Sequence, residues 1–532
     1  MRYLHEDAEG VYHLDHRLTP EVRAMFCAMS SRMPAGGIVA RYQEVIEAVA
    51  EDLLETAGWP TLAAMRGDST RGGDLRDFFD QAEKRLTTYP LHPKVQVFFD
   101  QFVGMYGHSS IMELTGSPSV YMEGISWYDA WLTFDNPLVA GQEFSTRAVR
   151  HKDWPMARSC YRVVECMFGT SEAQYVGSIP PRTEFKADEP LPKAFADIEM
   201  KKVRSLAPHP ELKELHADWF EVNNAEVEWW KDHLSVAANR EALGIADKEP
   251  FRPALDRARG TIPGTFATGC AHTGNLRTMA RVLQVGSLLA QRGKADVPQQ
   301  VWADMQKGYE AAVPGIAEMG LREAVYGEAT RLPAHLLIGR VDPGSEVELR
   351  LLPSEYRRPV SDAVKARQEG ERTYLDASLN QHLLVEVAFQ CSLAVARDWH
   401  RHRAMFPWFL DLVRSMSKDI QLHPAYVPRS ELGIAEVPGL LRRSTEVYDS
   451  FMAEDNQMQA VLALPMGTHV QMRGTGGLRD VVYMLELRAH AHGANFEYKA
   501  QAEEAIRQLR DQLGVLGRPQ NQKDSLLDLV GI

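Results

Sequence analysis

The chain has 532 residues, which is more than one typical hydrophobic core contains, so two or more packed units are expected. An apolar content of 45% and a charged content of 25% are ordinary for a globular protein that folds in water. The net charge of −13 argues against a general nucleic-acid-binding surface and leaves nucleotide monomers as candidate ligands.

The sequence predicts neither a membrane span nor a secretion signal. No apolar run approaches the roughly 18 to 20 residues that a bilayer requires, and the N-terminus lacks the basic-then-apolar pattern of a signal peptide. We therefore expect a cytoplasmic protein. Its five cysteines are scattered and include no CxxC pair, which predicts buried, reduced thiols rather than disulfides or a zinc knuckle.

In chain order, helices are predicted first. Apolar residues recur at helical spacing after Leu18-Thr-Pro-Glu21 and again from Val45 to Leu54. Residues 61–90 are polar and rich in turn residues, and a helix is expected to resume over 93–103. Next, Met105-Tyr-Gly-His-Ser-Ser-Ile-Met-Glu113 combines a glycine turn with small hydroxyl residues and a carboxylate, which is typical of a loop that faces a ligand.

Residues of about 185–250 are charged and contain Trp219, Trp229 and Trp230, which predicts amphipathic helices that cover a core. A helix over 299–312 is expected to end at Val313-Pro-Gly315, a natural boundary. Beyond it, residues 335–341 and 347–352 are predicted strands separated by a turn.

The apolar run 385–396 leads into Arg397-Asp-Trp-His-Arg-His-Arg403, which holds three arginines and two histidines. Such a cluster can be a solvated helix end that pairs with nearby carboxylates, or it can bind phosphate, because guanidinium groups match phosphate oxygens in a bidentate way. A metal site is a third candidate, since 400–402 and 490–492 each have the pattern HxH. Both segments look helical, where residues two apart diverge, so no metal is expected.

Two distant segments resemble each other. Residues 258–277 and 460–479 share an apolar residue before proline, a following threonine, a strand-like stretch and Thr-Gly-x-Leu-Arg, with identical spacing. This predicts two degenerate copies of one unit, over 1–312 and 313–532, which are called the first and second halves below. The helices of about 185–250 would then be an insertion in the first copy.

The Arg-His-Arg triplet 401–403, together with Leu464-Pro, Leu478-Arg and Leu485-Glu-Leu-Arg488, resembles the flavin-dependent thymidylate synthase family. In the first half, 106–113 resembles the family's Gly-His-x-Ser-x-x-Glu flavin loop, and Glu143-Phe-Ser-Thr-Arg147 resembles its pyrimidine-nucleotide loop. The resemblance implies an α+β fold, here in two fused copies, each with a mixed or antiparallel sheet and packed helices.

The resemblance also implies roles for individual residues. Arg488 would stabilise charge that develops on the uracil ring, Ser145 would donate a hydrogen bond, and both are its candidate catalytic residues. The implied substrate-binding set is Glu143, Ser145, Arg147, Arg259, Arg401 and Arg488. The implied flavin-binding set is His108, Ser110, Asn275, Arg277, Arg401, His402, Arg403 and His492.

Each half lacks what the other keeps. The first half has Thr133-Phe-Asp135 about where the triplet is expected, and Gly286 where the second has Arg488. The second half has Val461 in place of Arg259 and no serine at the expected position after Arg403. We therefore expect one composite site made from both halves. Because the family's site forms within a homotetramer, a homodimer of this chain would imitate that assembly.

The implied reaction transfers a one-carbon unit from methylenetetrahydrofolate to C5 of a pyrimidine nucleotide, most simply dUMP to dTMP. No side chain supplies hydride, so FAD would donate it and NADPH would reduce the flavin. Two alternatives stay open: a related C5 methylation or hydroxymethylation of another pyrimidine nucleotide, and a non-catalytic protein that retains the fold. No other catalytic motif, P-loop or dinucleotide fingerprint accompanies a suitable strand and helix.

Overall fold

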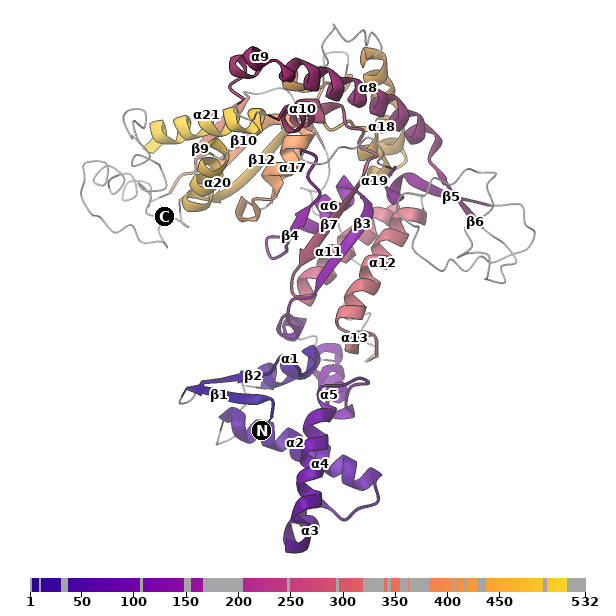
Figure 1. Ribbon diagram of the computed structural model, residues 1–532, viewed down its shortest axis with the longest axis vertical. Helices are drawn as coiled ribbons and strands as arrows, with labels where there is room; N and C mark the ends of the chain where they lie inside the picture. Colours follow the sequence, from indigo (N-terminus) through magenta and orange to yellow (C-terminus); the bar gives the residue numbers. More distant parts are fainter. Residues whose placement is uncertain are drawn as a thin grey trace.

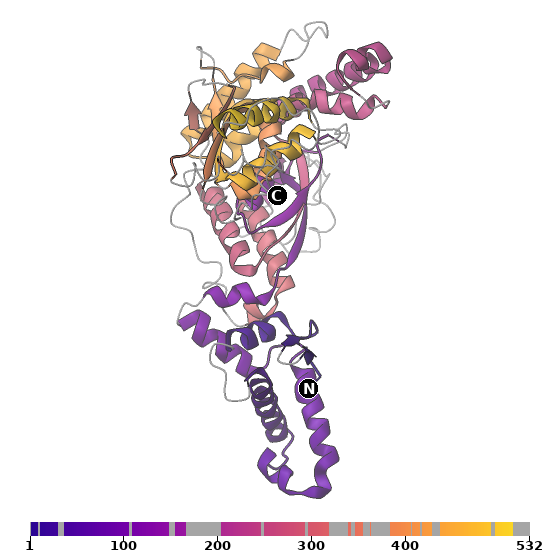
Figure 2. The ribbon, with the colours of Figure 1, turned by 90° about the vertical axis from the view of Figure 1, so that its left-hand side faces the viewer.

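The computed structural model describes residues 2–8, 11–29, 37–105, 109–147, 155–165, 204–245, 249–292, 296–318, 339–341, 346–354, 362, 383–405, 407–414, 418–427, 437–490 and 495–513. An N-terminal lobe occupies one end of the molecule, and a five-stranded, a three-stranded and a two-stranded β-sheet with their helices occupy the other (Figures 1 and 2). The chain is therefore a mixture of helices and mainly antiparallel sheets, as the predicted α+β class requires.

The N-terminal lobe confirms the first predicted helices. A two-stranded ribbon precedes helices that bury Val22, Phe26 and Val49. The expectation that residues 61–90 are mostly turns is wrong, because most of them form helices whose apolar residues pack beside α2. The elements are β1 (Leu4–Ala8), β2 (Val11–Leu14), α1 (Pro20–Met29), α2 (Gly37–Thr56), α3 (Leu62–Gly67), α4 (Gly72–Arg85) and α5 (Pro93–Phe99).

The first-half sheet has three antiparallel strands in the order β3 (Ser119–Ser126), β7 (Ala267–Thr273), β4 (Ala140–Glu143). Helix α6 (Trp127–Phe134) follows β3 directly, since the Ser126 hydroxyl caps it by accepting from the Asp129 amide at 3.0 Å. After β7 come α11 (Leu276–Arg292) and α12 (Asp296–Ala312), which ends where the Val313-Pro-Gly315 boundary was predicted.

The second-half sheet has five strands in the order β8-β11-β12-β10-β9. Both strands predicted beyond residue 334 are present within the described residues, but they lie at opposite edges of this sheet and do not pair with each other. The strands are β8 (Gly339–Val341), β9 (Val347–Leu351), β10 (Leu384–Ser392), β11 (Phe409–Val413) and β12 (His469–Gly477).

Helices follow the second-half strands in the same sequence as in the first half. Helix α17 (Leu393–His400) begins at Ser392, whose hydroxyl accepts from the Val395 amide at 3.2 Å, and has eight residues like α6. Helices α20 (Leu478–His490) and α21 (Phe496–Leu513) follow β12 as α11 and α12 follow β7. The strand order β10-β12-β11 likewise matches β3-β7-β4.

The two halves share one continuous apolar core. Backbone hydrogen bonds join the two repeat segments, from Met466 N to Ile262 O at 2.9 Å and from Gly467 N to Gly260 O at 2.5 Å. Gly264 permits this approach, because a Cβ at that position would overlap the Leu464 carbonyl. The segments that resemble each other in sequence therefore lie against each other.

The predicted helices around 185–250 also join the halves. Helix α8 (Pro210–Ser235) packs on α18 (Val437–Ala453), and Trp219 Nε1 donates to Ser444 Oγ at 3.0 Å. Residues 185–203 lie outside the described residues. The remaining elements are β5 (Tyr161–Glu165), β6 (Arg204–Pro208), α9 (Ala237–Ala242), α10 (Phe251–Ala258), α13 (Gly315–Glu318) and α19 (Gln457–Ala460).

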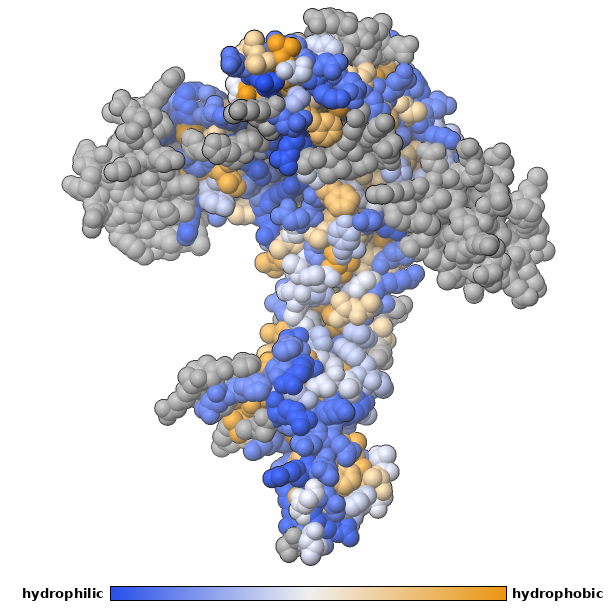
Figure 3. All heavy atoms as spheres, in the orientation of Figure 1, coloured by the Kyte–Doolittle hydropathy of each residue, from blue (hydrophilic) through white to orange (hydrophobic). Residues whose placement is uncertain are grey.

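The described helices include none with the length and apolarity needed to cross a membrane. On the face drawn in Figure 3, hydrophilic residues cover much of the N-terminal lobe. Of the described cysteines, Cys160, Cys270 and Cys391 are buried free thiols as expected, whereas Cys27 is exposed, contrary to the prediction of buried thiols.

Candidate functional site

The Arg397–Arg403 segment covers the last turn of α17 and the residues that follow it, and it meets the first half at the end of β4. Arg397 forms an ion pair with Glu143, both almost fully buried, and Arg401 approaches the other Glu143 oxygen at 3.4 Å. Burial, reinforced by the charge of Arg401, lowers the pKa of Arg397 to about 9, which still leaves it cationic at neutral pH. The arginine cluster is therefore an inter-half contact rather than a solvated helix end.

Arg259 makes a second buried contact between the halves. Its guanidinium pairs with Asp398 at 2.8 Å and donates to the carbonyl of Ala394 at 2.7 Å. Burial alone would raise the pKa of Asp398, but the charges of Arg259 and Arg401 outweigh it and hold that pKa well below its ordinary value. Arg259 thus anchors α17 from the first half.

Arg488 lies on α20 beside the same helix end. Its Nε donates to His402 Nε2 at 2.9 Å and its Nη2 to the Asp398 carbonyl at 3.2 Å. Burial and the charge of Arg488 lower the pKa of His402 to about 3, so the imidazole is neutral and can accept this bond. The structure thus brings Arg488 and the Arg-His-Arg triplet together.

Arg147 approaches this group from the other half. Its Nη1 donates to the hydroxyl of Tyr498 at 2.9 Å, and its Nε pairs with Asp256 at 2.7 Å. The guanidinium carbons of Arg147 and Arg488 lie 5.7 and 5.1 Å from the centroid of the same Tyr498 ring. Ser145, which is exposed, accepts from the Arg147 backbone amide at 3.2 Å and so shapes this loop.

The charge of the cluster favours an anion. Among the described residues, the Nε atoms of Arg259, Arg397 and Arg401 are buried without a hydrogen-bond partner, and Arg488 Nη1 makes no hydrogen bond. Such donors suit phosphate or carboxylate oxygens. Four arginines (Arg147, Arg259, Arg397, Arg401) pair with three carboxylates, Glu143, Asp256 and Asp398, and a fifth, Arg488, donates to the backbone carbonyl of Asp398.

The other predicted flavin-binding residues lie on the first-half side. Asn275 Oδ1 accepts from the Thr278 amide at 2.9 Å and so caps α11, while Arg277 forms an exposed ion pair with Glu113 at 2.5 Å. Arg403 donates to the carbonyls of Pro137 and Val139, in the loop that precedes β4. A Cβ at Gly274 would lie 3.4 Å from the carbonyl of Leu138, so the Asn275 turn borders the loop that Arg403 holds.

Three predicted residues have no side chain described. His108 and His492 lie outside the described residues, and Ser110 is placed only by its backbone, within the 3₁₀ helix Ser109–Thr115. The histidines of the 400–402 pattern have separate partners: His400 lies 3.3 Å from Asp135 and stacks on Trp131, while His402 accepts from Arg488. Among the described residues, no group of three or more His, Cys, Asp or Glu could hold a metal ion.

Sequence reasoning missed Tyr498 and Asp256. Tyr498 sits in the first turn of an amphipathic helix, where an aromatic residue usually belongs to the core, and Asp256 lies in a helix with no motif. Their one sequence signal is proximity to recognised segments, because Tyr498 follows Arg488 by ten residues and Asp256 precedes Arg259 by three. Neither spacing indicates an arginine contact.

Residues 371–513 match the family model described as thymidylate synthase complementing protein. The match spans the second-half strands β10, β11 and β12 and helices α17, α20 and α21, and so includes the Arg-His-Arg triplet and Arg488. No curated protein matches the chain.

Proposed function

Because residues 371–513 match the thymidylate synthase complementing protein family, we propose that the chain is a flavin-dependent thymidylate synthase that methylates C5 of a pyrimidine nucleotide, most simply converting dUMP to dTMP. The one-carbon unit would come from methylenetetrahydrofolate. The observation that supports this most is the convergence of Arg147 and Arg488, from opposite halves, on one tyrosine ring beside the triplet 401–403.

The proposed substrate contacts follow from which donors are accessible. Arg147, Ser145 and Arg401 border the site and would bind the nucleotide phosphate, which guanidinium and hydroxyl donors suit. Arg488 would face the pyrimidine ring, where a fixed cation stabilises the negative charge that develops when the ring reacts. Arg259 and Glu143 form buried ion pairs with Asp398 and Arg397, so we assign them to holding α17 and its triplet in place.

The residues present fit a flavin with a pyrophosphate group. Arg403 and Arg277 offer guanidinium groups near the Asn275 turn, and Arg401 has a buried Nε without a partner among the described residues. Together with His402, Asn275 and Ser110 they would hold FAD, as family resemblance implies. When bound, reduced FAD supplies the hydride that no side chain can, and NADPH reduces it.

We further propose that the halves are degenerate copies of one unit, with a boundary near residue 313. The identical strand order, the equal lengths of α6 and α17 and their serine caps support this. A homodimer would then present four such units. Sedimentation of the active protein as a strict monomer would contradict the dimer.

Tritium release from uracil-labelled dUMP, with methylenetetrahydrofolate, NADPH and FAD present, tests the reaction. We expect release by the wild-type chain and at least a hundredfold loss in Arg488→Ala. Arg443→Ala is the control, since Arg443 forms an exposed inter-half ion pair with Asp218 away from the triplet, and it should retain activity. If the protein released no tritium from dUMP but turned over another pyrimidine nucleotide, that nucleotide and not dUMP would be the substrate.

A flavin absorption band of the purified protein, or of the protein reconstituted with FAD, tests the cofactor separately. A chain that neither carries FAD nor binds it would support the non-catalytic alternative.

A further inference from the structure

The pairing registers of the two sheets define equivalent positions in the two halves. Glu143 pairs with Cys270 on β7, and Leu410 pairs with Met472 on β12. Cys270 and Met472 are equivalent in the repeat 258–277 and 460–479, so Leu410 is the counterpart of Glu143. Counting onward along the strand, Leu412 is the counterpart of Ser145 and Arg414 that of Arg147.

The helices define a second set of equivalent positions. Because α6 and α17 begin at equivalent capping serines and have eight residues each, Asp135-Asn-Pro137 is the counterpart of Arg401-His-Arg403, two residues beyond the predicted Thr133-Phe-Asp135. By the same count, Trp131 is the counterpart of Arg397. The triplet end of α17 meets β4 of the first half, so an equivalent second site would be built from the end of α6 and from β11.

That second position lacks the chemistry of the first. Leu410 and Leu412 replace a carboxylate and a hydroxyl, and Asp135 replaces an arginine of the triplet. Both leucines lie on β11, and their side chains are buried in the core. An anion would therefore meet apolar side chains and a carboxylate there, which disfavours its binding.

The cation that remains at the second position is engaged elsewhere. Arg414 pairs with both carboxylate oxygens of Asp449, at 2.9 and 3.2 Å, and donates to the Lys418 carbonyl at 2.9 Å. Its guanidinium also lies 5.5 Å from the centroid of the Tyr448 ring. Arg147 also pairs with a carboxylate, Asp256, but it lies beside the exposed Ser145 and shares the Tyr498 ring with Arg488.

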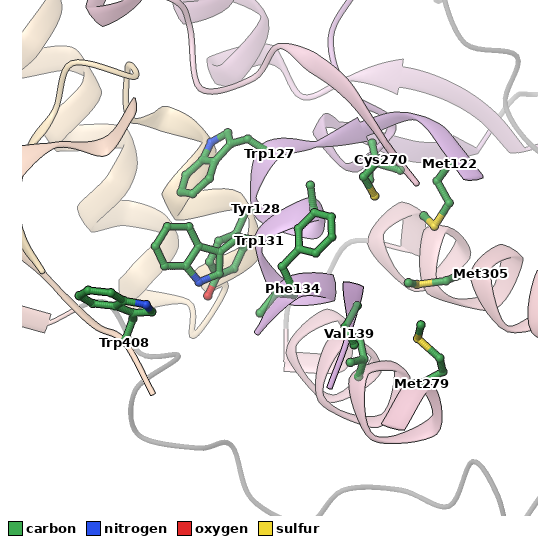
Figure 4. Close-up of a cluster of buried hydrophobic side chains, with 14 of the residues drawn as sticks. Met122, Trp127, Tyr128, Trp131, Phe134, Val139, Cys270, Met279, Met305 and Trp408 are labelled. Atoms are coloured by element: carbon green, nitrogen blue, oxygen red, sulfur yellow. The ribbon is translucent and has the colours of Figure 1, made fainter. Parts of the chain in front are cut away.

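The space itself is also filled. Trp131 is buried in the cluster of α6 with Trp127 and Tyr128, as Figure 4 shows, and the ring of His400 stacks on it at 3.8 Å. Gly286 stands where Arg488 stands in the second half, and even a Cβ there would overlap the ring of Trp302. The equivalent arginine could not be accommodated without repacking α12.

We infer that each chain has one nucleotide-binding site, between β4 and the end of α17, and that its pseudo-symmetric counterpart is a closed packing contact between the halves. This inference rests on the proposed function, because it assigns the number and place of the sites for that nucleotide. It predicts that the two register-equivalent arginines, Arg147 and Arg414, differ completely in their effect on binding.

Equilibrium dialysis of the full-length, FAD-saturated protein against labelled dUMP measures the number of sites. We expect one dUMP per chain, whatever the oligomeric state. Two dUMP per chain would overturn the inference and leave the proposed function intact. A wild-type chain that binds no pyrimidine nucleotide would overturn the proposed function, and this inference with it.

Matched variants locate the site. Arg147→Ala should weaken dUMP binding at least tenfold, whereas Arg414→Ala should keep the dissociation constant within twofold and the stoichiometry at one. Since Arg414→Ala also removes a bidentate ion pair, Arg414→Lys is the second variant, which keeps the charge beside Asp449. Equal losses of dUMP binding in folded Arg147 and Arg414 variants would overturn the assignment.

Discussion

Glu143 and Arg397 form a buried ion pair that joins segments 254 residues apart in the chain. Glu143 ends a first-half strand, and Arg397 lies on the helix that leads into the Arg-His-Arg triplet. The pair thus fixes the position of the triplet against the loop 143–147, which resembles the family's nucleotide-binding loop. The Glu143 carboxylate also lies 3.4 Å from Arg401, so this one acidic residue orients two arginines.

Glu143→Gln should therefore destabilise the fold by about 3 kcal/mol, because removing one partner leaves the buried charge of Arg397 uncompensated. Urea unfolding measures this loss. Glu348→Gln is the control, since Glu348 pairs with Arg350 on the surface, and removing this exposed pair should not change the unfolding free energy detectably. Equal effects of the two substitutions would mean that the buried pair has no special role.

Tyr498 should position both site arginines. Tyr498→Phe keeps the ring but removes the hydroxyl that accepts from Arg147, so nucleotide affinity should fall about fivefold, the equivalent of one hydrogen bond of about 1 kcal/mol. Tyr498→Leu also removes the ring shared with Arg488, and its effect should be larger and appear in kcat as well as KM.

Tyr448→Phe is the matched control for this pair of variants, because Tyr448 is a buried tyrosine that also lies beside an arginine, Arg414, but in the second half. It should leave KM and kcat unchanged. If Tyr498→Leu loses stability but binds the nucleotide with wild-type affinity, Tyr498 is a core residue and does not position the arginines.

Several helices and the family match of residues 371–513 could be predicted from the sequence because each depends on local patterns. Helical periodicity located α1, α2 and α12, and the common spacing of 258–277 and 460–479 predicted two strands that prove to be central in their sheets. Residues 61–90 were mispredicted because a polar, glycine-containing segment can still form α4 when one face packs on α2.

The site could be predicted only in part, because its pairings are tertiary. The sequence motifs predict Arg147, Arg401 and Arg488 as site residues. They cannot show that Arg259 forms a buried ion pair with Asp398. Nor does any local pattern place Tyr498 beneath two arginines that lie 351 and 10 residues away in the sequence. Burial separates anchoring arginines from ligand-facing ones, and burial depends on the packing of both halves.

Glu497 should make stability depend on pH. Its carboxylate is buried and accepts from the Ser392 amide at 2.6 Å and hydroxyl at 2.7 Å. Burial raises its pKa from 4.5 to about 7, so the folded state favours the protonated acid. The stabilisation is fully present below pH 4.5 and is lost as pH rises through about 7, by about 3 kcal/mol relative to an uncharged residue.

The difference in unfolding free energy between the wild type and Glu497→Gln, measured from pH 4.5 to 8, isolates this effect. His423 lies 3.8 Å from Glu497 and titrates in the opposite sense, since burial lowers its pKa to about 4 and folding is weakened as pH falls towards that value. Because the two groups are in contact, the same difference is also measured in a His423→Gln background, where this second titration is absent. A difference that does not change with pH would mean that Glu497 has an ordinary pKa.

The closed second position should not tolerate even one added methyl group. Gly286→Ala puts a Cβ into the ring of the buried Trp302, and the packed α11 and α12 cannot separate without loss, so we expect a destabilisation of 1 to 3 kcal/mol, on the order of other overpacked cores. Gly73→Ala is the control, because Gly73 is also helical but has open space around its Cβ position, and it should stabilise the protein by up to about 1 kcal/mol. Thermal or urea unfolding compares the two. If Gly286→Ala were as stable as the wild type, α11 and Trp302 would be loosely packed, and the position equivalent to Arg488 would have room for a side chain after all.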